Sequence, residues 1–167
     1  MVTAGDLRTL MSDEGKAVEV PADTDLSGRS ARAECYVSRK PERTDPVVRI
    51  EVGQADELSY RLARDGETAW VGTGANKVLD VGAGVEGWLK DNHASLLLLK
   101  CDSGRAGRPA AVYRQVFVWG GFLDSDLPER ERTQLFVDLA RRTAAEVVRQ
   151  EGCPEVRIAD RAPAVAG

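Results

Sequence analysis

The second half of the chain contains one long stretch with helical periodicity. Over residues 126–152, "DLPERERTQLFVDLARRTAAEVVRQEG", apolar positions recur every three or four residues, which predicts an amphipathic helix. Asp126 as N-cap, Pro128 in the first turn and Glu129 in a capping-box position favour a start at 126. Gly152 favours the end. The expected apolar stripe consists of Leu135, Phe136, Leu139, Ala140, Ala144, Val147 and Val148.

Shorter runs with strand-like alternation precede this helix. Asp65–Gly66 is a hairpin signal between two of these runs, which favours an antiparallel meander. We also expect a short helix over 3–15 and one or two helical turns over 84–92, "GVEGWLKDN". The expected strands cover residues 16–20, 33–39, 47–53, 57–64, 67–72, 94–101 and 110–121.

These elements predict an α+β fold. An antiparallel sheet would carry a short N-terminal helix, a short middle helix and the long C-terminal helix packed on it. At 167 residues the chain is long enough for one domain with its own core, and we assign that domain to 1–158. Residues 159–167 are expected to fray, because "RAPAVAG" at the end lacks apolar bulk.

The charge, the apolar runs and the cysteines of the chain limit which partners and which compartment we expect. The net charge is −4 and no block of Lys and Arg stands out, so we expect neither a nucleic-acid nor a membrane ligand. The longest purely apolar run, residues 96–99, is far too short to cross a bilayer. Cys35, Cys101 and Cys153 are odd in number and form no CxxC pair, which favours unpaired thiols in a reducing cytoplasm.

The stretch "KVLDVGAGVEGWL", residues 77–89, raises the question of a cofactor-binding turn. It is similar to the first motif of S-adenosylmethionine-dependent methyltransferases. That resemblance implies that Asp80, Gly82 and Gly84 approach the cofactor and that Asp102 holds the ribose hydroxyls. The segment before residue 94 is too short for a parallel crossover helix, however, and the chain after Asp102 is too short for the rest of that fold. A connector between an antiparallel meander and a short helix is therefore the favoured reading, with no cofactor.

Catalytic and metal-binding chemistry is poorly represented. His93 is the only histidine, and no nucleophile–base motif or metal-ligand cluster is present in the sequence. We therefore expect no catalytic residues and no metal, which favours a role other than that of an enzyme.

Three aromatic residues stand on one face of the last predicted strand. Tyr113, Phe117 and Trp119 share this face by period-two alternation, and the other face is also largely apolar. One face should meet the long helix. The other would meet a partner subunit or the N-terminal helix, so these three residues are the candidate partner-binding residues.

The order of elements resembles that of the YbjN family of sensory-transduction regulators, which have a type III secretion chaperone-like fold. The resemblance lies in residues 5–20 ("GDLRTLMSDEGKAVEV"), 91–100 ("DNHASLLLLK") and 112–148. It implies a protein-binding or regulatory module, chaperone-like or adaptor, that acts as a homodimer and holds a partner segment. The alternatives are an S-adenosylmethionine-binding enzyme that uses residues 77–89 and a small-molecule sensor.

Overall fold

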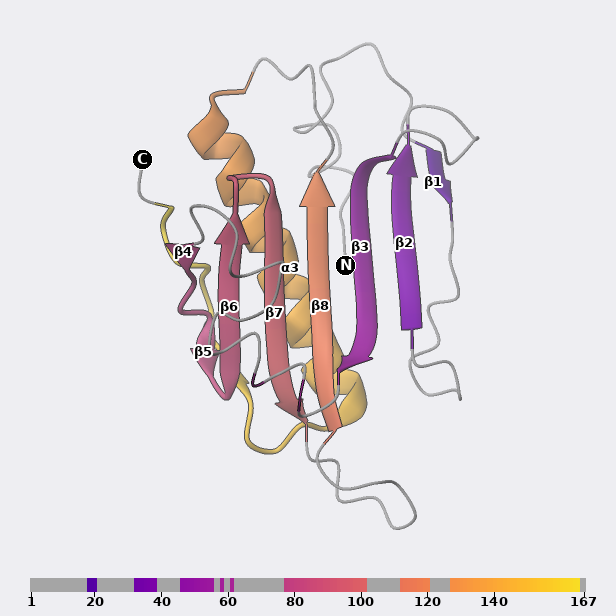
Figure 1. Cartoon of the computed structure of the whole chain (residues 1–167), viewed down its shortest axis with the longest axis vertical. Helices are drawn as coiled ribbons and strands as arrows, with labels where there is room; N and C mark the ends of the chain where they lie inside the picture. The colour runs from indigo at the N-terminus through magenta and orange to yellow at the C-terminus, as the bar shows by residue number, and fades with distance from the viewer. Residues whose placement is uncertain are drawn as a thin grey trace.

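The computed structural model describes residues 18–20, 32–38, 46–55, 58, 61, 77–101, 112–120 and 127–165. These residues form strands and one long helix (Figure 1). The elements are β1 (Val18–Val20), β2 (Arg32–Ser38), β3 (Pro46–Ala55), β4 (Lys77–Val78), β5 (Gly82–Ala83), β6 (Val85–Lys90), β7 (Ala94–Cys101), β8 (Val112–Gly120), α3 (Glu129–Glu151) and β9 (Arg157–Ile158).

The main sheet has seven strands in the order β1-β2-β3-β8-β7-β6-β4, and its neighbouring strands are antiparallel. Mixed α+β architecture is therefore confirmed, and β2, β3, β7 and β8 fall where alternation predicted strands. Within the meander expected over 33–72, β2 and β3 are antiparallel neighbours as predicted, and the other neighbour of β3 is β8, which also pairs with β7. The strand expected over 57–64 is wrong at its two described residues, Leu58 and Arg61, which are helical.

Helix α3 crosses one face of the sheet diagonally, behind the strands in the view of Figure 1. Alternate residues of β7 and β8 point to this face, so Leu97, Leu99, Val116 and Val118 are fully buried against the helix. On the helix, the predicted positions Phe136, Leu139, Ala140, Ala144 and Val147 are buried, together with Thr133 and Val137. The predicted apolar stripe is thus confirmed, with Leu135 and Val148 packed at its border.

The two ends of α3 differ in how well the sequence predicted them. Gly152 ends the helix as expected, with a φ of 69°, and its N–H donates to the Val148 carbonyl at 2.9 Å. The N-cap is Pro128, which makes no side-chain capping bond. The helix therefore begins at Glu129 and not at 126, and Asp126 lies outside the described residues.

The middle helix expected over 84–92 is wrong. Residues 85–90 are strand β6, and the chain then turns directly into β7. Asp91 and Asn92 have φ values of 49° and 58°, and the His93 N–H donates to the Lys90 carbonyl at 3.2 Å. Asp and Asn tolerate this left-handed geometry better than other non-glycine residues, so "KDNH" forms a hairpin turn and not the end of a helix.

The end of the chain is held in place as far as residue 165, contrary to the expected fraying. The Gln134 side chain donates to the Pro163 carbonyl at 3.0 Å and accepts from the Val165 N–H at 2.9 Å. Val165 itself is buried. One amide side chain on α3 thus satisfies two backbone groups of the terminal segment, an interaction that local composition does not reveal.

Some expectations concern other parts of the chain. The helix over 3–15, the Asp65–Gly66 hairpin, the strand over 67–72 and residues 166–167 lie outside the described residues. Within the described residues, no helix combines the length and the apolar character needed to cross a membrane.

Candidate functional site

The glycines of residues 77–89 face the chain's own C-terminal segment. Gly82 and Gly84 have φ values of 132° and 72°, conformations that favour glycine. A Cβ on Gly82 would lie 2.0 Å from the Arg157 carbonyl oxygen, and one on Gly84 would lie 2.6 Å from that of Glu155. The space that the methyltransferase resemblance assigns to a cofactor is therefore taken by backbone of the same chain.

The methyltransferase resemblance assigned Asp80 and Asp102 to the cofactor, and these two acids do not form a cofactor site in the described residues. Asp80 is exposed, and its carboxylate accepts from the Gly82 N–H at 3.3 Å, a local turn contact. Asp102 lies outside the described residues. β6 follows the glycines directly and runs antiparallel to β7, whereas the methyltransferase motif needs a strand, a turn and then a helix. Residues 77–89 form neither a cofactor turn nor the expected connector to a short helix, because they contain β4, β5 and most of β6.

The C-terminal segment is clamped on several sides. β5 pairs with β9 through Gly82 with Ile158 and Ala83 with Arg157. The Ala159 N–H donates to the Val81 carbonyl at 2.8 Å, and Arg141 of α3 donates to the Ala159 carbonyl at 3.0 Å.

A disulfide joins Cys101, the last residue of β7, to Cys153, just after α3. The expectation of unpaired thiols is therefore wrong for these two residues. They are 52 residues apart in sequence and come together because β7 and α3 end at the same side of the molecule. Cys35 on β2 takes no part in this disulfide and is partly buried. Spacing along the chain could not reveal the pair, since only the tertiary fold brings it together.

A buried ion pair lies between the sheet and the helix near this disulfide. Arg114 Nη2 of β8 is 2.7 Å from Glu151 Oε1 of α3, and the two side chains are only 7% and 8% exposed. Arg114 Nε is buried without a hydrogen-bond partner. Sequence reasoning missed this pair, although an arginine inside the apolar run "VYRQVFVW" was a usable signal.

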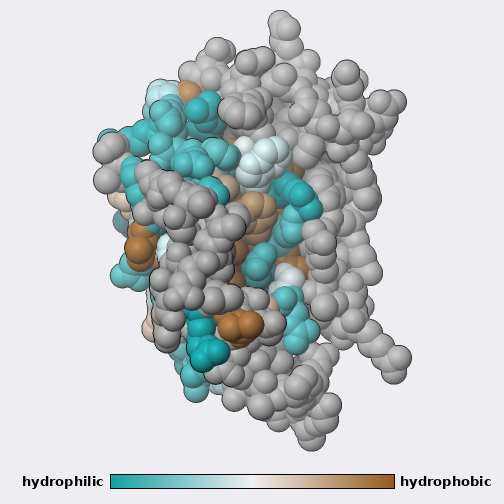
Figure 2. Space-filling model, viewed as in Figure 1, coloured by the Kyte–Doolittle hydropathy of each residue, from teal (hydrophilic) through white to brown (hydrophobic). Residues whose placement is uncertain are grey.

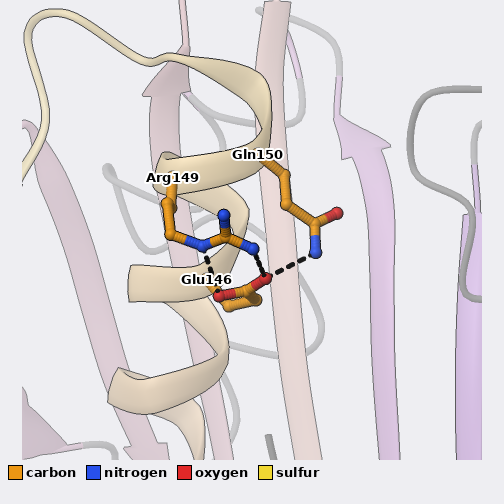
Figure 3. Close-up of polar contacts among 3 residues, drawn as sticks. All are labelled: Glu146, Arg149 and Gln150. Atoms are coloured by element: carbon orange, nitrogen blue, oxygen red, sulfur yellow. Dashed lines mark hydrogen bonds and ion pairs between the residues drawn. The ribbon is translucent and has the colours of Figure 1, made fainter.

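The outward side of α3 carries a polar cluster of three residues (Figure 3). Arg149 Nε donates to Glu146 Oε2 at 2.9 Å, and Gln150 Nε2 donates to Glu146 Oε1 at 2.6 Å. The bonds from Arg149, and next from Gln150, lower the pKa of Glu146 to about 2. The Glu146 carboxylate likewise raises the pKa of Arg149. Both side chains are more than a third exposed, so this cluster is a solvated helix face.

The candidate partner-binding residues lie on the face opposite α3. Tyr113 is buried within the chain, whereas Phe117 and Trp119 are partly exposed. Phe117 packs against a second apolar cluster, which consists of Ala55, Trp88, Leu96, Leu98 and Tyr113. We call Phe117 and Trp119 the aromatic strip. Figure 2 views the molecule from this side and shows hydrophobic and hydrophilic surface side by side where the described residues are visible.

Charged residues border the aromatic strip on the neighbouring strand. In the register of β3 and β8, Glu51 lies opposite Phe117 and Arg49 lies opposite Trp119. Arg49 and Glu51 form an ion pair with each other. The strip therefore has apolar neighbours toward β7 and both signs of charge toward β3.

Reactive groupings are not found in the described part of the chain. No three His, Cys, Asp or Glu residues there are placed to hold a metal ion. His93 sits in the β6–β7 turn, with Nδ1 2.7 Å from the Asp91 carbonyl oxygen. In comparisons with known proteins, no family model, no curated protein and no solved structure matches the chain.

Proposed function

We propose that the chain is a non-enzymatic, protein-binding or regulatory module, chaperone-like or adaptor, that acts as a homodimer through the aromatic strip. The observation that carries the proposal is the position of Phe117 and Trp119. They are partly exposed on β8, the central strand of the seven, next to a buried apolar cluster. Aromatic side chains at the centre of such a face supply large contact area, and they are enriched at protein interfaces.

The surroundings of the strip favour a second copy as the occupant. A twofold dimer places the same patch on both copies, so the patch must complement itself. Arg49 and Glu51 flank the strip on one strand, two residues apart. In a twofold arrangement each Arg49 can face the Glu51 of the other copy while the aromatic residues meet at the centre.

The order of elements supports the chaperone-like reading. Strands β1 to β3 and β6 to β8 each form consecutive antiparallel neighbours, and the long helix follows β8. The resemblance to the YbjN family rests on an order that also has a short middle helix, where the structure has β6; the antiparallel strands followed by a long helix are the part of that order found here. The short N-terminal helix, the cytoplasmic location and the dimer stay predictions.

A charge-reversal pair tests the dimer geometry. Arg49→Glu and Glu51→Arg should each weaken self-association, because each variant brings like charges together across the twofold axis. A 1:1 mixture of the two variants should recover the dimer, measured by sedimentation velocity. A mixture no more dimeric than either variant alone would contradict the twofold arrangement.

A pull-down from the native cell lysate tests the binding role. Because the module is proposed to act as a dimer, Trp119→Ala, which weakens the dimer, should also lose a stoichiometric partner that the wild-type chain retains through a moderate salt wash. Val78→Ser is the matched control, because Val78 is an exposed apolar residue on the edge strand β4. Loss of the partner in the Val78 variant but not in the Trp119 variant would place binding at the sheet edge and overturn the proposal.

A further inference from the structure

Residues 153–165, which we call the strap, run back along the molecule after α3 ends. In Figure 1 this segment passes beside β5 toward the C-terminus. Val156 and Val165 of the strap are buried in the main core cluster, which also contains Leu79 and Val81. The strap thus closes the side of the core that lies between α3 and β5.

The non-covalent attachment of the strap is limited. Among the described residues its polar contacts are the two-residue pairing of β5 with β9, the Ala159–Val81 backbone bond, and the side-chain bonds from Arg141 and Gln134; Val156 and Val165 add buried apolar contact. The Lys100–Glu155 ion pair, at 2.8 Å, is about half exposed and contributes little. A terminal segment held by few hydrogen bonds opens locally more readily than the strands and the helix of the core.

The disulfide lies where the strap begins. Cys153 follows Gly152, which is exposed, has a left-handed φ of 69° and has nothing within 4 Å of the place where its Cβ would be. Gly152, the C-cap of α3, is the position at which the chain leaves the helix and enters the strap. The bond to Cys101 is the only covalent tie, other than the chain itself, that the described residues provide between the strap and the sheet.

We propose that the Cys101–Cys153 disulfide is a redox latch that determines whether the strap stays docked. A dithiol reductant opens it by thiolate attack, through a mixed disulfide; the two cysteines become thiols and the reductant becomes its own cyclic disulfide. Because both sulfurs are buried, attack occurs when the strap opens locally. Once reduced, the strap swings away from the end of α3 and uncovers Leu79 and Val81, an apolar surface beside Gly82 of β5.

This latch links the fold to the redox state of the compartment. In a reducing cytoplasm, the location that the sequence predicts, the pair would be thiols and the latch open; in an oxidising compartment it would be closed. The inference concerns the strap alone and does not depend on the dimer through the aromatic strip.

Amide hydrogen exchange on the full chain, read by NMR with and without a dithiol reductant, tests the latch. The amides of Ala159 and Val165 report the strap, because they bond to Val81 and Gln134. Reduction should speed their exchange at least ~10-fold and leave the amides of Val116 and Val118 in β8 unchanged. Unchanged strap amides, or equal acceleration in β8, would overturn the proposal.

Two variants and a thiol count complete the experiment. Cys153→Ser should show the fast strap exchange without reductant, and Cys35→Ser, the control, should behave as wild type. If Cys153→Ser does not fold, alkylation of the wild-type chain decides instead. Under oxidising conditions one cysteine should react in the unfolded chain, against three after reduction. Three reactive cysteines under oxidising conditions would overturn the proposal.

Discussion

At the scale of single residues, Gly82 shows what determines the stretch that resembled a cofactor motif. Its φ of 132° and the 2.0 Å separation between a built Cβ and the Arg157 carbonyl leave no room for any other side chain. The glycines are there so that a second strand of the same chain can approach closely.

Gly82→Ala should lower the free energy of unfolding by about 2 kcal/mol or more, because backbone atoms must move to admit the methyl group. Gly152→Ala is the matched control. Gly152 also has a positive φ but is surrounded by open space, so we expect a cost of only about 1 kcal/mol. Urea unfolding measures both. An equal loss of unfolding free energy in the two variants would mean that the close approach of the Arg157 carbonyl to Gly82 does not add to the cost of the substitution.

Glu146 provides a residue-scale test of the electrostatics. Its pKa in the folded protein, about 2, is below its usual 4.5, so the folded state binds this proton less tightly than the unfolded state does. Any stability from this group is therefore fully present above about pH 4.5 and is lost as the pH falls toward 2. Because the group is solvated, screening keeps that contribution small.

Carboxyl NMR titration should find the Glu146 midpoint near 2 in the wild-type chain. In Arg149→Ala the midpoint should rise toward 4.5, since the hydrogen bonds from Arg149 are the largest cause of the shift. Gln150→Ala should raise it less. An unshifted wild-type midpoint would contradict the hydrogen-bonded cluster.

At the residue scale, the sequence therefore indicated which residues were unusual but not which other residues they contact. The sequence shows which residues are glycine, cysteine or arginine, but not which residues they contact. Arg157 contacts Gly82, Cys153 bonds to Cys101 and Glu151 pairs with Arg114 only because the tertiary fold brings them together. Local propensity carries no information on contacts between residues so far apart along the chain.

At the scale of elements, the length of each helix or strand determined whether the sequence pattern could predict it. The 23 residues of α3 span several turns, so helical periodicity was clear, and the eight residues of β7 were predicted exactly where they occur. The six residues of β6 contain one glycine, Gly87, and span less than two helical turns, so periodicity could not separate strand from helix. Their pairing with β7 decided the outcome.

The contact between α3 and β8 depends on the Arg114–Glu151 pair. Removing one partner leaves a buried, unpaired charge, so Arg114→Met or Glu151→Gln should cost about 3–5 kcal/mol, measured by urea unfolding. The double variant Arg114→Met/Glu151→Met should recover most of that loss, because two apolar side chains replace two desolvated charges. A double variant as unstable as the two single losses combined would contradict this reading.

At the scale of the whole molecule, two features determine the proposed behaviour. α3 and the strap close one face of the sheet, and the opposite face carries the aromatic strip on its central strand. The α+β class followed from the order of elements in the sequence. The strand order did not, because the insertion of β8 between β3 and β7 depends on pairing between residues 58 to 72 positions apart, which no local pattern encodes.

Sedimentation equilibrium of the full chain, across a wide concentration range, tests the central claim most directly. The account predicts a mass of twice 18.1 kDa for the wild-type chain and a dissociation constant roughly 30-fold weaker for Trp119→Ala, with Val78→Ser unchanged. A wild-type chain that stays at 18.1 kDa at every concentration, or a Trp119 variant that associates as tightly as the wild type, would contradict it.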